Sequence, residues 1–344
     1  MAREKHSGQV GVAFFGFGYW GANYVRIFRE LPDSWDVVLC DVRPERLQEA
    51  RKRFPGVSLT THVDEALDME GVHAAVISTQ AQHHHDVARK CLEAGKHVLI
   101  EKPITLTSEH AQDLINLAES KKLVLMVGHT FLYNPAVRKV KEYIDQSELG
   151  RLYYMYSSRT NLGPVRKDVN ALWDLATHDV SIFNYFMGGP PQWVSATGAK
   201  LLRSQQEDVG FVTLGYANEV VGHIHVSWAD PNKVREVVVV GSDKRVVFDD
   251  LNALERVRIY EKGITSTVDD SSSYGEFYFT MRDGDIISPR IEVSEPLKNQ
   301  CIHFLDCVKH NTRPFTDGQA GLDVVRVMEA IDRSMHEKST VDVV

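Results

Sequence analysis

The sequence predicts an α/β fold: an N-terminal parallel sheet with helices on both faces, then a C-terminal α+β domain on an open, mostly antiparallel sheet. Three observations predict it. A glycine-rich turn joins an apolar strand to a helix near the start, strand and helix patterns alternate to residue 128, and alternating apolar and polar segments follow. At 344 residues the chain exceeds one usual domain, so we expect domains at 1–128 and 129–344, with a last helix at about 319–336 that packs back on the first.

The glycine-rich turn reads Gly16-Phe-Gly18-Tyr19-Trp20-Gly21 and stands between an apolar segment and a helical pattern. This G-x-G-x-x-G spacing, with an acid about 20 residues later, is the dinucleotide-binding fingerprint of the Rossmann fold. Gly16 allows the tight turn, Gly18 lets the backbone approach a pyrophosphate, and Gly21 lets the helix approach the strand. We therefore expect the turn, including Tyr19 and Trp20, to bind the cofactor.

Asp41 ends the second apolar segment and is the acid that the fingerprint requires. Its carboxylate can accept hydrogen bonds from the adenosine ribose and repels a 2′-phosphate, which favours NAD over NADP. Arg43 leaves NADP open, because a guanidinium can pair with that phosphate. The alternative for Arg43 is a solvated loop cation, so NAD is the predicted cofactor.

Several polar residues follow the later strands of the first domain. We expect strands and helices, in order, at 72–79, 86–94, 97–100, 108–121 and 123–128. Ligands of parallel sheets bind at the carboxyl ends of the strands. The residues that fall at these ends are Ser78, Thr79, Glu101, Lys102 and His129.

Beyond about residue 130 the pattern changes to that of an α+β domain. The helices are expected at 135–147, 171–187, 296–309 and 319–336. Strands are expected at 153–157, 193–199, 209–216, 220–228, 236–241 and 245–249. Residues 269–273, Asp-Asp-Ser-Ser-Ser, read as a loop.

Lys102 lies in Glu101-Lys102-Pro103 at a strand end, where a nicotinamide ring and a substrate would meet. A lysine held there can donate a hydrogen bond to a substrate hydroxyl and stabilise its charge in the transition state. In isolation the motif favours a surface lysine before a proline that stops the strand. The dinucleotide fingerprint favours the catalytic interpretation.

Asp174 and His178 are four residues apart in a predicted helix, so their side chains project from one face. A histidine beside a carboxylate can act as general base, taking the proton of an alcohol as hydride leaves carbon. A routine polar pair is the alternative. We expect no metal site, because a metal needs a third ligand here and His83-His84-His85 are consecutive residues that cannot all face one ion.

Composition excludes several classes of protein. The net charge of −8 and the lack of a basic stripe argue against nucleic acid as a partner. No apolar run is long enough to cross a membrane, and the polar N-terminus lacks a signal core, so we expect a cytoplasmic protein. The 4 cysteines form no C-x-x-C pair and are expected to be reduced and buried.

Together these motifs make the chain resemble the Gfo/Idh/MocA oxidoreductase family over essentially its full length. The residues that carry the resemblance are Gly16 to Gly21, Ser78-Thr79, Glu101-Lys102-Pro103 and Asp174-x-x-x-His178. The resemblance implies NAD(P)-dependent oxidation of an alcohol, or reduction of a ketone, on a sugar or cyclitol. It implies that Lys102 contacts the reacting hydroxyl, that Asp174 and His178 assist proton transfer, and that His84 lies at the cofactor. Many relatives carry prolines where this chain has Gln80-Ala81.

Within the family, three segments are similar to nucleotide-sugar 3-dehydrogenases, which act on UDP-N-acetylhexosamines or their uronic acids. These segments are residues 18–23, 128–135 and 161–174. The resemblance makes Tyr133, Asn161 and Arg166 candidates to hold substrate, with Arg166 suited to a carboxylate or phosphate. The alternatives are polar contacts within loops.

Other functions stay open at this point. The resemblance also allows a dehydrogenase of free sugars or inositols, an NAD-dependent glycosidase with no net redox change, or a non-catalytic dinucleotide-binding regulator. Lys102 and His178 are both present, which disfavours the regulator. An open sheet in the second domain favours a homodimer or homotetramer.

Overall fold

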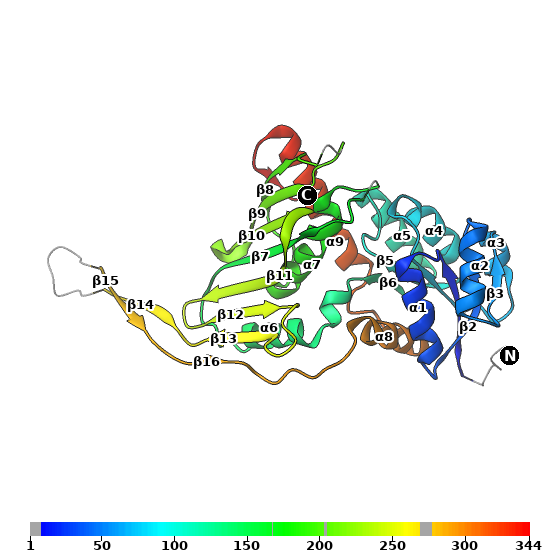
Figure 1. Cartoon of the computed structure of the whole chain (residues 1–344), viewed down its shortest axis with the longest axis horizontal. Coiled ribbons are helices and arrows are strands. Elements are labelled where there is room, and N and C mark those ends of the chain that lie inside the picture. Colours follow the sequence, from blue (N-terminus) through cyan, green and yellow to red (C-terminus); the bar gives the residue numbers. More distant parts are fainter. Residues whose placement is uncertain (1–7, 167, 203–204, 269–276) are drawn as a thin grey trace. The chain divides into compact units, whose positions relative to one another are not determined.

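The computed structural model describes residues 8–166, 168–202, 205–268 and 277–344 (Figure 1). The chain forms two compact units. The first is Met1–Tyr133 with Ser294–Arg326, and the second is Asn134–Val293 with Val327–Val344. The first unit therefore ends slightly later than the expected boundary at residue 128, and it includes Ser294–Arg326, which the sequence-based division placed in the second domain.

The first unit contains a parallel sheet with the strand order β3-β2-β1-β4-β5-β6. Its strands are β1 (Val10–Phe15), β2 (Ser34–Cys40), β3 (Ser58–Thr60), β4 (Ala74–Ile77), β5 (His97–Glu101) and β6 (Leu125–Gly128). The order reverses between β1 and β4, which is the switch point where ligands of such sheets bind. This parallel sheet confirms the predicted doubly wound domain.

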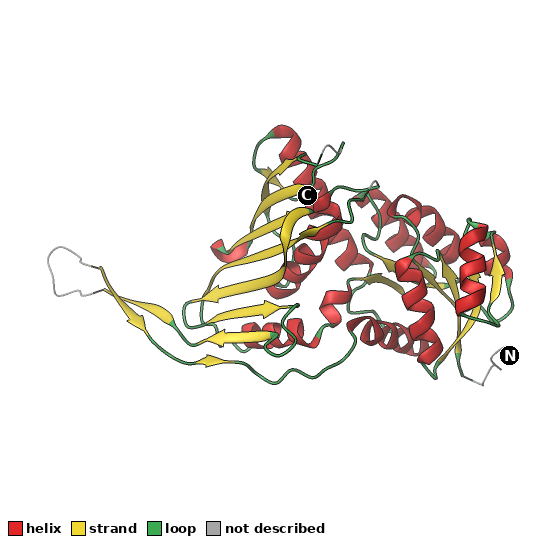
Figure 2. Ribbon diagram, viewed as in Figure 1, coloured by secondary structure: helices red, strands yellow, loops and turns green. Residues whose placement is uncertain are grey.

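Helices cover this sheet, as Figure 2 shows in red. They are α1 (Tyr19–Glu30), α2 (Pro44–Arg53), α3 (Val63–Asp68), α4 (His84–Glu93), α5 (Ser108–Ser120), α8 (Pro296–His310) and the short η1 (Ala81–His83) and η2 (Thr130–Tyr133). Helix α1 packs against α8, and α4 packs against α5. Phe28 joins the layers, with its ring 5.6 Å from Phe14 of β1 and 6.4 Å from Phe304 of α8.

The second unit contains a mixed sheet with the order β16-β13-β12-β11-β7-β10-β9-β8-β17. Its strands are β7 (Leu152–Leu162), β8 (Trp193–Ala199), β9 (Val209–Gly215), β10 (Val221–Ser227), β11 (Ala229–Gly241), β12 (Arg245–Asp249), β13 (Val257–Tyr260), β16 (Ile286–Ile287) and β17 (Val341–Asp342). β7 and β10 are parallel, and the other pairs in the sheet are antiparallel. The prediction of a mostly antiparallel sheet is confirmed.

One face of the mixed sheet is covered by helices of the same unit. These are α6 (Pro135–Asp145), the π-helical turn η3 (Leu172–Ala176), α7 (Thr177–Met187) and the last part of α9 (Gly318–Glu337), which begins in the first unit. Along β7, Met155, Ser157 and Arg159 are buried, whereas Tyr154 on the other face is exposed. This alternation is what an antiparallel sheet with one covered face requires.

Strands β14 (Gly263–Val268) and β15 (Phe277–Arg282) form a hairpin and pair with each other outside the mixed sheet (Figure 1). This hairpin was not predicted from the sequence. Strand β14 reads Gly-Ile-Thr-Ser-Thr-Val and has no run of apolar residues on one face, so its periodicity is weak. The loop predicted at 269–273 lies outside the described residues.

Candidate active site

The residue that directly follows each of β1, β2, β4, β5 and β6 is a predicted functional residue or a polar one. These residues are Gly16, Asp41, Ser78, Lys102 and His129. Because carboxyl ends of parallel strands meet at one edge of a sheet, the first unit gathers them along that edge.

The glycine turn has the geometry that the fingerprint demands. Gly16 has φ +90°, and a Cβ there would lie 2.8 Å from Ser78 O. A Cβ on Gly21 would lie 2.1 Å from Gly16 O, so the start of α1 can approach β1 only without a side chain. A Cβ on Gly18 would meet nothing within 4 Å, and Gly18 is the N-cap of α1, so there is open space at a helix N-terminus.

Tyr19 and Trp20 form the exposed first turn of α1. Their rings are edge to face at 5.4 Å, and 78% of Tyr19 is accessible. The structure places both beside the open space at Gly18, as expected from their sequence positions.

Asp41 is engaged by four donors. The backbone N–H groups of Phe17 and Arg43 donate to it at 2.7 and 3.0 Å, and the Arg43 guanidinium donates to both carboxylate oxygens at 3.0 Å. Burial alone disfavours the carboxylate, but Arg43 and the backbone donors outweigh it and hold the pKa of Asp41 below its ordinary value. Arg43 is therefore a partner of Asp41, while its side chain stays half-exposed.

Ser78, Thr79 and His84 link neighbouring strand ends. Ser78 Oγ donates to Gly16 O at 3.0 Å. His84 is buried, with Nδ1 2.7 Å from Pro103 O and Nε2 3.2 Å from Thr79 O. The imidazole thus joins the loop after β4 to the loop that carries Lys102.

Glu101 heads a buried chain of hydrogen bonds. Tyr24 OH donates to Glu101 Oε1 at 2.7 Å, Gln300 Nε2 donates to Tyr24 OH at 2.9 Å, and Thr130 Oγ1 donates to Gln300 Oε1 at 2.9 Å. The Lys102 N–H donates to Glu101 Oε2 at 3.2 Å. Burial and the adjacent carboxylate raise the pKa of Tyr24 well above its ordinary value. This chain fixes the backbone at Lys102.

Tyr133, a predicted substrate residue, is 2% exposed. Its hydroxyl is 3.1 Å from Thr316 Oγ1, and its carbonyl accepts from Asn299 at 3.1 Å. The structure places Tyr133 in the packing of the first unit.

The second unit brings together Arg166, Asp168 and Asp174. Arg166 donates to Asp174 Oδ1 at 3.0 Å and to Asp168 through Nε at 3.0 Å. Burial disfavours the guanidinium charge, but the two carboxylates outweigh it and raise the pKa of Arg166. Sequence reasoning named Arg166 and Asp174 separately and missed both their pairing and Asp168. Asn161 donates to Gly163 O at 2.5 Å, a contact within its own loop.

Asp174 lies in the π-helical turn η3, and His178 lies in the first turn of α7. Single π turns within helices occur often at functional sites. The next residue after His178, Asp179, is buried and accepts two hydrogen bonds of 2.9 Å from the buried Arg159 of β7. This ion pair attaches the start of α7 to the mixed sheet.

Two sequence models cover most of the chain. The model described as an oxidoreductase family with an NAD-binding Rossmann fold, Gfo/Idh/MocA, matches residues 10–129, and the Gfo/Idh/MocA C-terminal domain matches residues 137–247. The chain belongs to the Gfo/Idh/MocA oxidoreductase family. This confirms the predicted family, its Rossmann domain that binds NAD, and the assignment as an oxidoreductase.

Other family members are similar over most of their length. UDP-N-acetylglucosamine 3-dehydrogenase of Acidithiobacillus ferrooxidans is 28% identical over 74% of this chain and 76% of the relative. Myo-inositol 2-dehydrogenase of Thermotoga maritima is 23% identical over 97% of this chain and 98% of the relative. The crystal structure of GenD2 from gentamicin A biosynthesis, in complex with NAD, superposes with a TM-score of 0.82 at 25% identity and covers 99% of both chains.

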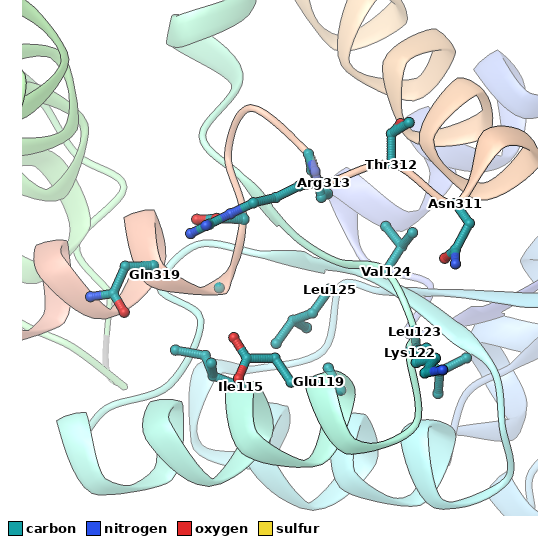
Figure 3. A pocket seen from close by; sticks show the side chains of 14 residues that line it. Ile115, Glu119, Lys122, Leu123, Val124, Leu125, Asn311, Thr312, Arg313 and Gln319 are labelled. Carbon is teal, nitrogen blue, oxygen red and sulfur yellow. The ribbon is translucent and has the colours of Figure 1, made fainter.

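One pocket of the first unit lies away from the residues that follow the strand ends. A cavity of about 300 Å³ is lined by the end of α5, the start of β6 and the segment 311–319. Figure 3 shows the side chains that line it. Leu125, at the amino end of β6, lies in its wall, whereas His129 follows the carboxyl end of that strand. Among the described residues no cluster could hold a metal ion, and no helix could cross a membrane.

Proposed function

We propose that the chain transfers hydride between NAD and a secondary hydroxyl or ketone of a sugar, and that its substrate is a nucleotide sugar oxidised at C3. The observation that carries the proposal is the placement of Lys102 at the same sheet edge as the open glycine turn. The similarity to UDP-N-acetylglucosamine 3-dehydrogenase supports the substrate class.

The residues of the first unit fit NAD. The uncapped N-terminus of α1 and the space at Gly18 suit a pyrophosphate, and Asp41 suits the adenosine ribose. When bound, NAD supplies the hydride acceptor. Ser78, Thr79, His84 and Glu101 shape the edge at which it binds.

The chain itself supplies the proton chemistry. Lys102 donates a hydrogen bond to the reacting hydroxyl and stabilises the negative charge that develops on its oxygen. His178 takes the hydroxyl proton, and Asp174 stabilises the imidazolium that results. Arg166 orients Asp174 through their 3.0 Å contact, and together with Asn161 it holds the polar part of the substrate.

Absorbance at 340 nm tests the proposal. The protein is mixed with NAD, and separately NADP, against free hexoses, inositols, and UDP-N-acetylhexosamines with their uronic acids. NADH formed from the UDP-sugars alone supports the proposed substrate, whereas NADH from inositols supports the second candidate that the similarity to myo-inositol 2-dehydrogenase favours.

Lys102→Met gives the matched test of mechanism, since it removes the charge and keeps an unbranched side chain. We expect the chemical rate to fall roughly 10²- to 10⁴-fold with NAD affinity retained, measured by single-turnover kinetics and by NAD fluorescence titration. Unchanged turnover would remove Lys102 from the mechanism.

We also propose that the protein is a homo-oligomer that pairs through the uncovered face of the mixed sheet. Tyr154, Phe211 and Val221 lie on this face and are exposed. Phe211 stacks on His225 of the neighbouring strand at 4.6 Å. Large exposed apolar patches mark interaction surfaces.

A further inference from the structure

His129 is a buried histidine whose ring is not hydrogen-bonded. It is 1% exposed, and neither Nδ1 nor Nε2 has a hydrogen-bond partner among the residues that the structure describes. Buried polar atoms are nearly always paired, because each one left unpaired lowers stability. We therefore expect the His129 ring to have a hydrogen-bond partner when the protein is active.

The sheet register places His129 beside Lys102. Gly128, the last residue of β6, is the partner of Glu101, the last residue of β5. The next residue along each strand is His129 and Lys102, respectively. The positive charge of Lys102 acts on the imidazole and, after burial, is the second cause that lowers the pKa of His129 to about 4.

The other polar side chains near Lys102 already form hydrogen bonds with one another. Glu101, Tyr24, Gln300 and Thr130 form the buried chain described above. At neutral pH the His129 ring is uncharged, so it offers one N–H donor and one lone pair. An ammonium has three donors and no acceptor, so the group beside His129 that matches the lone pair is Lys102.

We propose that His129 is a positioning residue for Lys102: its neutral imidazole accepts a hydrogen bond from the Lys102 ammonium, directly or through one water, and so orients the ammonium toward the reacting hydroxyl. The proposal rests on the proposed role of Lys102. Hydrogen bonds in active sites are often long in the free protein and shorten in the complex.

Substitution of His129 distinguishes a role in positioning Lys102 from a role in packing. His129→Phe keeps the ring and removes the unpaired nitrogens, so we expect an equal or higher Tm together with a kcat lowered about 10- to 100-fold. His129→Gln or His129→Asn, which restores an acceptor, recovers part of kcat. A purely structural histidine would show a lower Tm with unchanged kcat, and that result would overturn the proposal.

His97 is the matched control, because it is a partly buried histidine at the other end of β5 with a defined structural bond. Its Nδ1 accepts from the Val124 N–H at 3.0 Å. His97→Phe leaves that N–H unpaired, so we expect a lower Tm and an unchanged kcat. Equal loss of kcat in the two variants would contradict a specific role for His129.

A second measurement needs no substrate and therefore stands apart from the proposed reaction. The NAD-loaded protein, labelled with ¹⁵N at histidine, is compared with Lys102→Met, and the His129 signals are assigned by their loss in His129→Gln. We expect the acceptor nitrogen of His129 to change its chemical shift when Lys102 is replaced. Identical shifts in the two proteins would refute the contact even if the enzyme is active.

Discussion

At the level of single residues, we predict that Asp41 and Arg43 together set the preference for NAD. Arg43 occupies both carboxylate oxygens, so the ribose of a bound cofactor competes with it. We expect Asp41→Ala to weaken NAD roughly 10-fold and to strengthen NADP, because the freed guanidinium can then pair with a 2′-phosphate. Titration of both cofactors by fluorescence measures this.

Arg46→Ala is the control for charge alone, since Arg46 is on the adjacent helix and pairs with Glu49 at 3.0 Å. Its cofactor affinities should match those of the unmodified protein. If Asp41→Ala left the ratio of NAD to NADP affinity unchanged, neither residue would determine the preference.

His129 also makes stability depend on pH. Its pKa of about 4 in the folded protein is below the ordinary value of 6.5, so the unfolded chain binds this proton first as the pH falls. Stability from this group is therefore lost between pH 6.5 and about 4. Between pH 7 and pH 5 the loss is roughly 2 kcal/mol.

Urea unfolding at pH 7 and pH 5 measures this contribution when the unmodified protein is compared with His129→Phe. The variant should lose less stability on acidification, by about that amount. An equal loss in both proteins would show that His129 does not titrate between folded and unfolded states in this range. His97, whose pKa is lowered by burial, is present in both proteins and cancels in the comparison.

Residue types and their local spacing were predictable from the sequence, whereas their partners were not. The glycine turn and the acid at Asp41 depend on residues close in sequence. Tyr24 and Glu101, by contrast, are 77 residues apart, and their hydrogen bond depends on how α1 packs against β5. The site roles of the individual residues stay predictions that the variants above test.

At the scale of elements, the Arg159–Asp179 pair is the attachment of α7 to the mixed sheet. Both side chains are almost fully buried, at 4% and 1% exposure. Removing one partner leaves the other charge buried and unpaired, so Asp179→Ala should lower the free energy of unfolding by roughly 3–5 kcal/mol. Urea unfolding measures this change.

The double variant Arg159→Met with Asp179→Leu should recover much of that loss, because no buried charge remains. Lys139→Ala is the surface control; its pair with Glu142 is exposed and should contribute less than about 1 kcal/mol. A loss in Asp179→Ala no larger than in this control would show that the pair does not hold α7.

Helices and strands with a strong hydrophobic pattern were predictable, and those without one were not. The buried strands of the parallel sheet are continuous apolar runs, as in Val10–Phe15, so they are evident from composition. The π-helical turn Leu172–Ala176 differs from an α-helix by its hydrogen-bond register alone, which no residue pattern in the segment announces. The segment was therefore expected as ordinary helix.

At the scale of the whole molecule, the chain returns to its first unit after building the second. Helix α8 is placed there because Phe304, Leu305 and Cys301 complete the core that Phe14 and Phe28 begin. Sequence order suggested that everything after residue 128 except the last helix belongs together, because an apolar helix face does not state which sheet it will cover. Such pairing over nearly 300 residues is a tertiary property.

The uncovered face of the mixed sheet carries the last prediction, which concerns assembly. Tyr154 and Phe211 are exposed by 46% and 43%, and glutamate at both positions would place charges in an apolar interface. We expect Tyr154→Glu with Phe211→Glu to shift the mass in light scattering to the 38.9 kDa of one chain, with an unchanged circular dichroism spectrum.

Leu254→Glu is the matched control, since Leu254 is 93% exposed between β12 and β13 and outside the face. It should leave the mass of the unmodified protein unchanged. Because pairing of this face would bury aromatic side chains that a monomer leaves in water, an unmodified protein that scatters as a single chain at working concentration would contradict the proposed assembly.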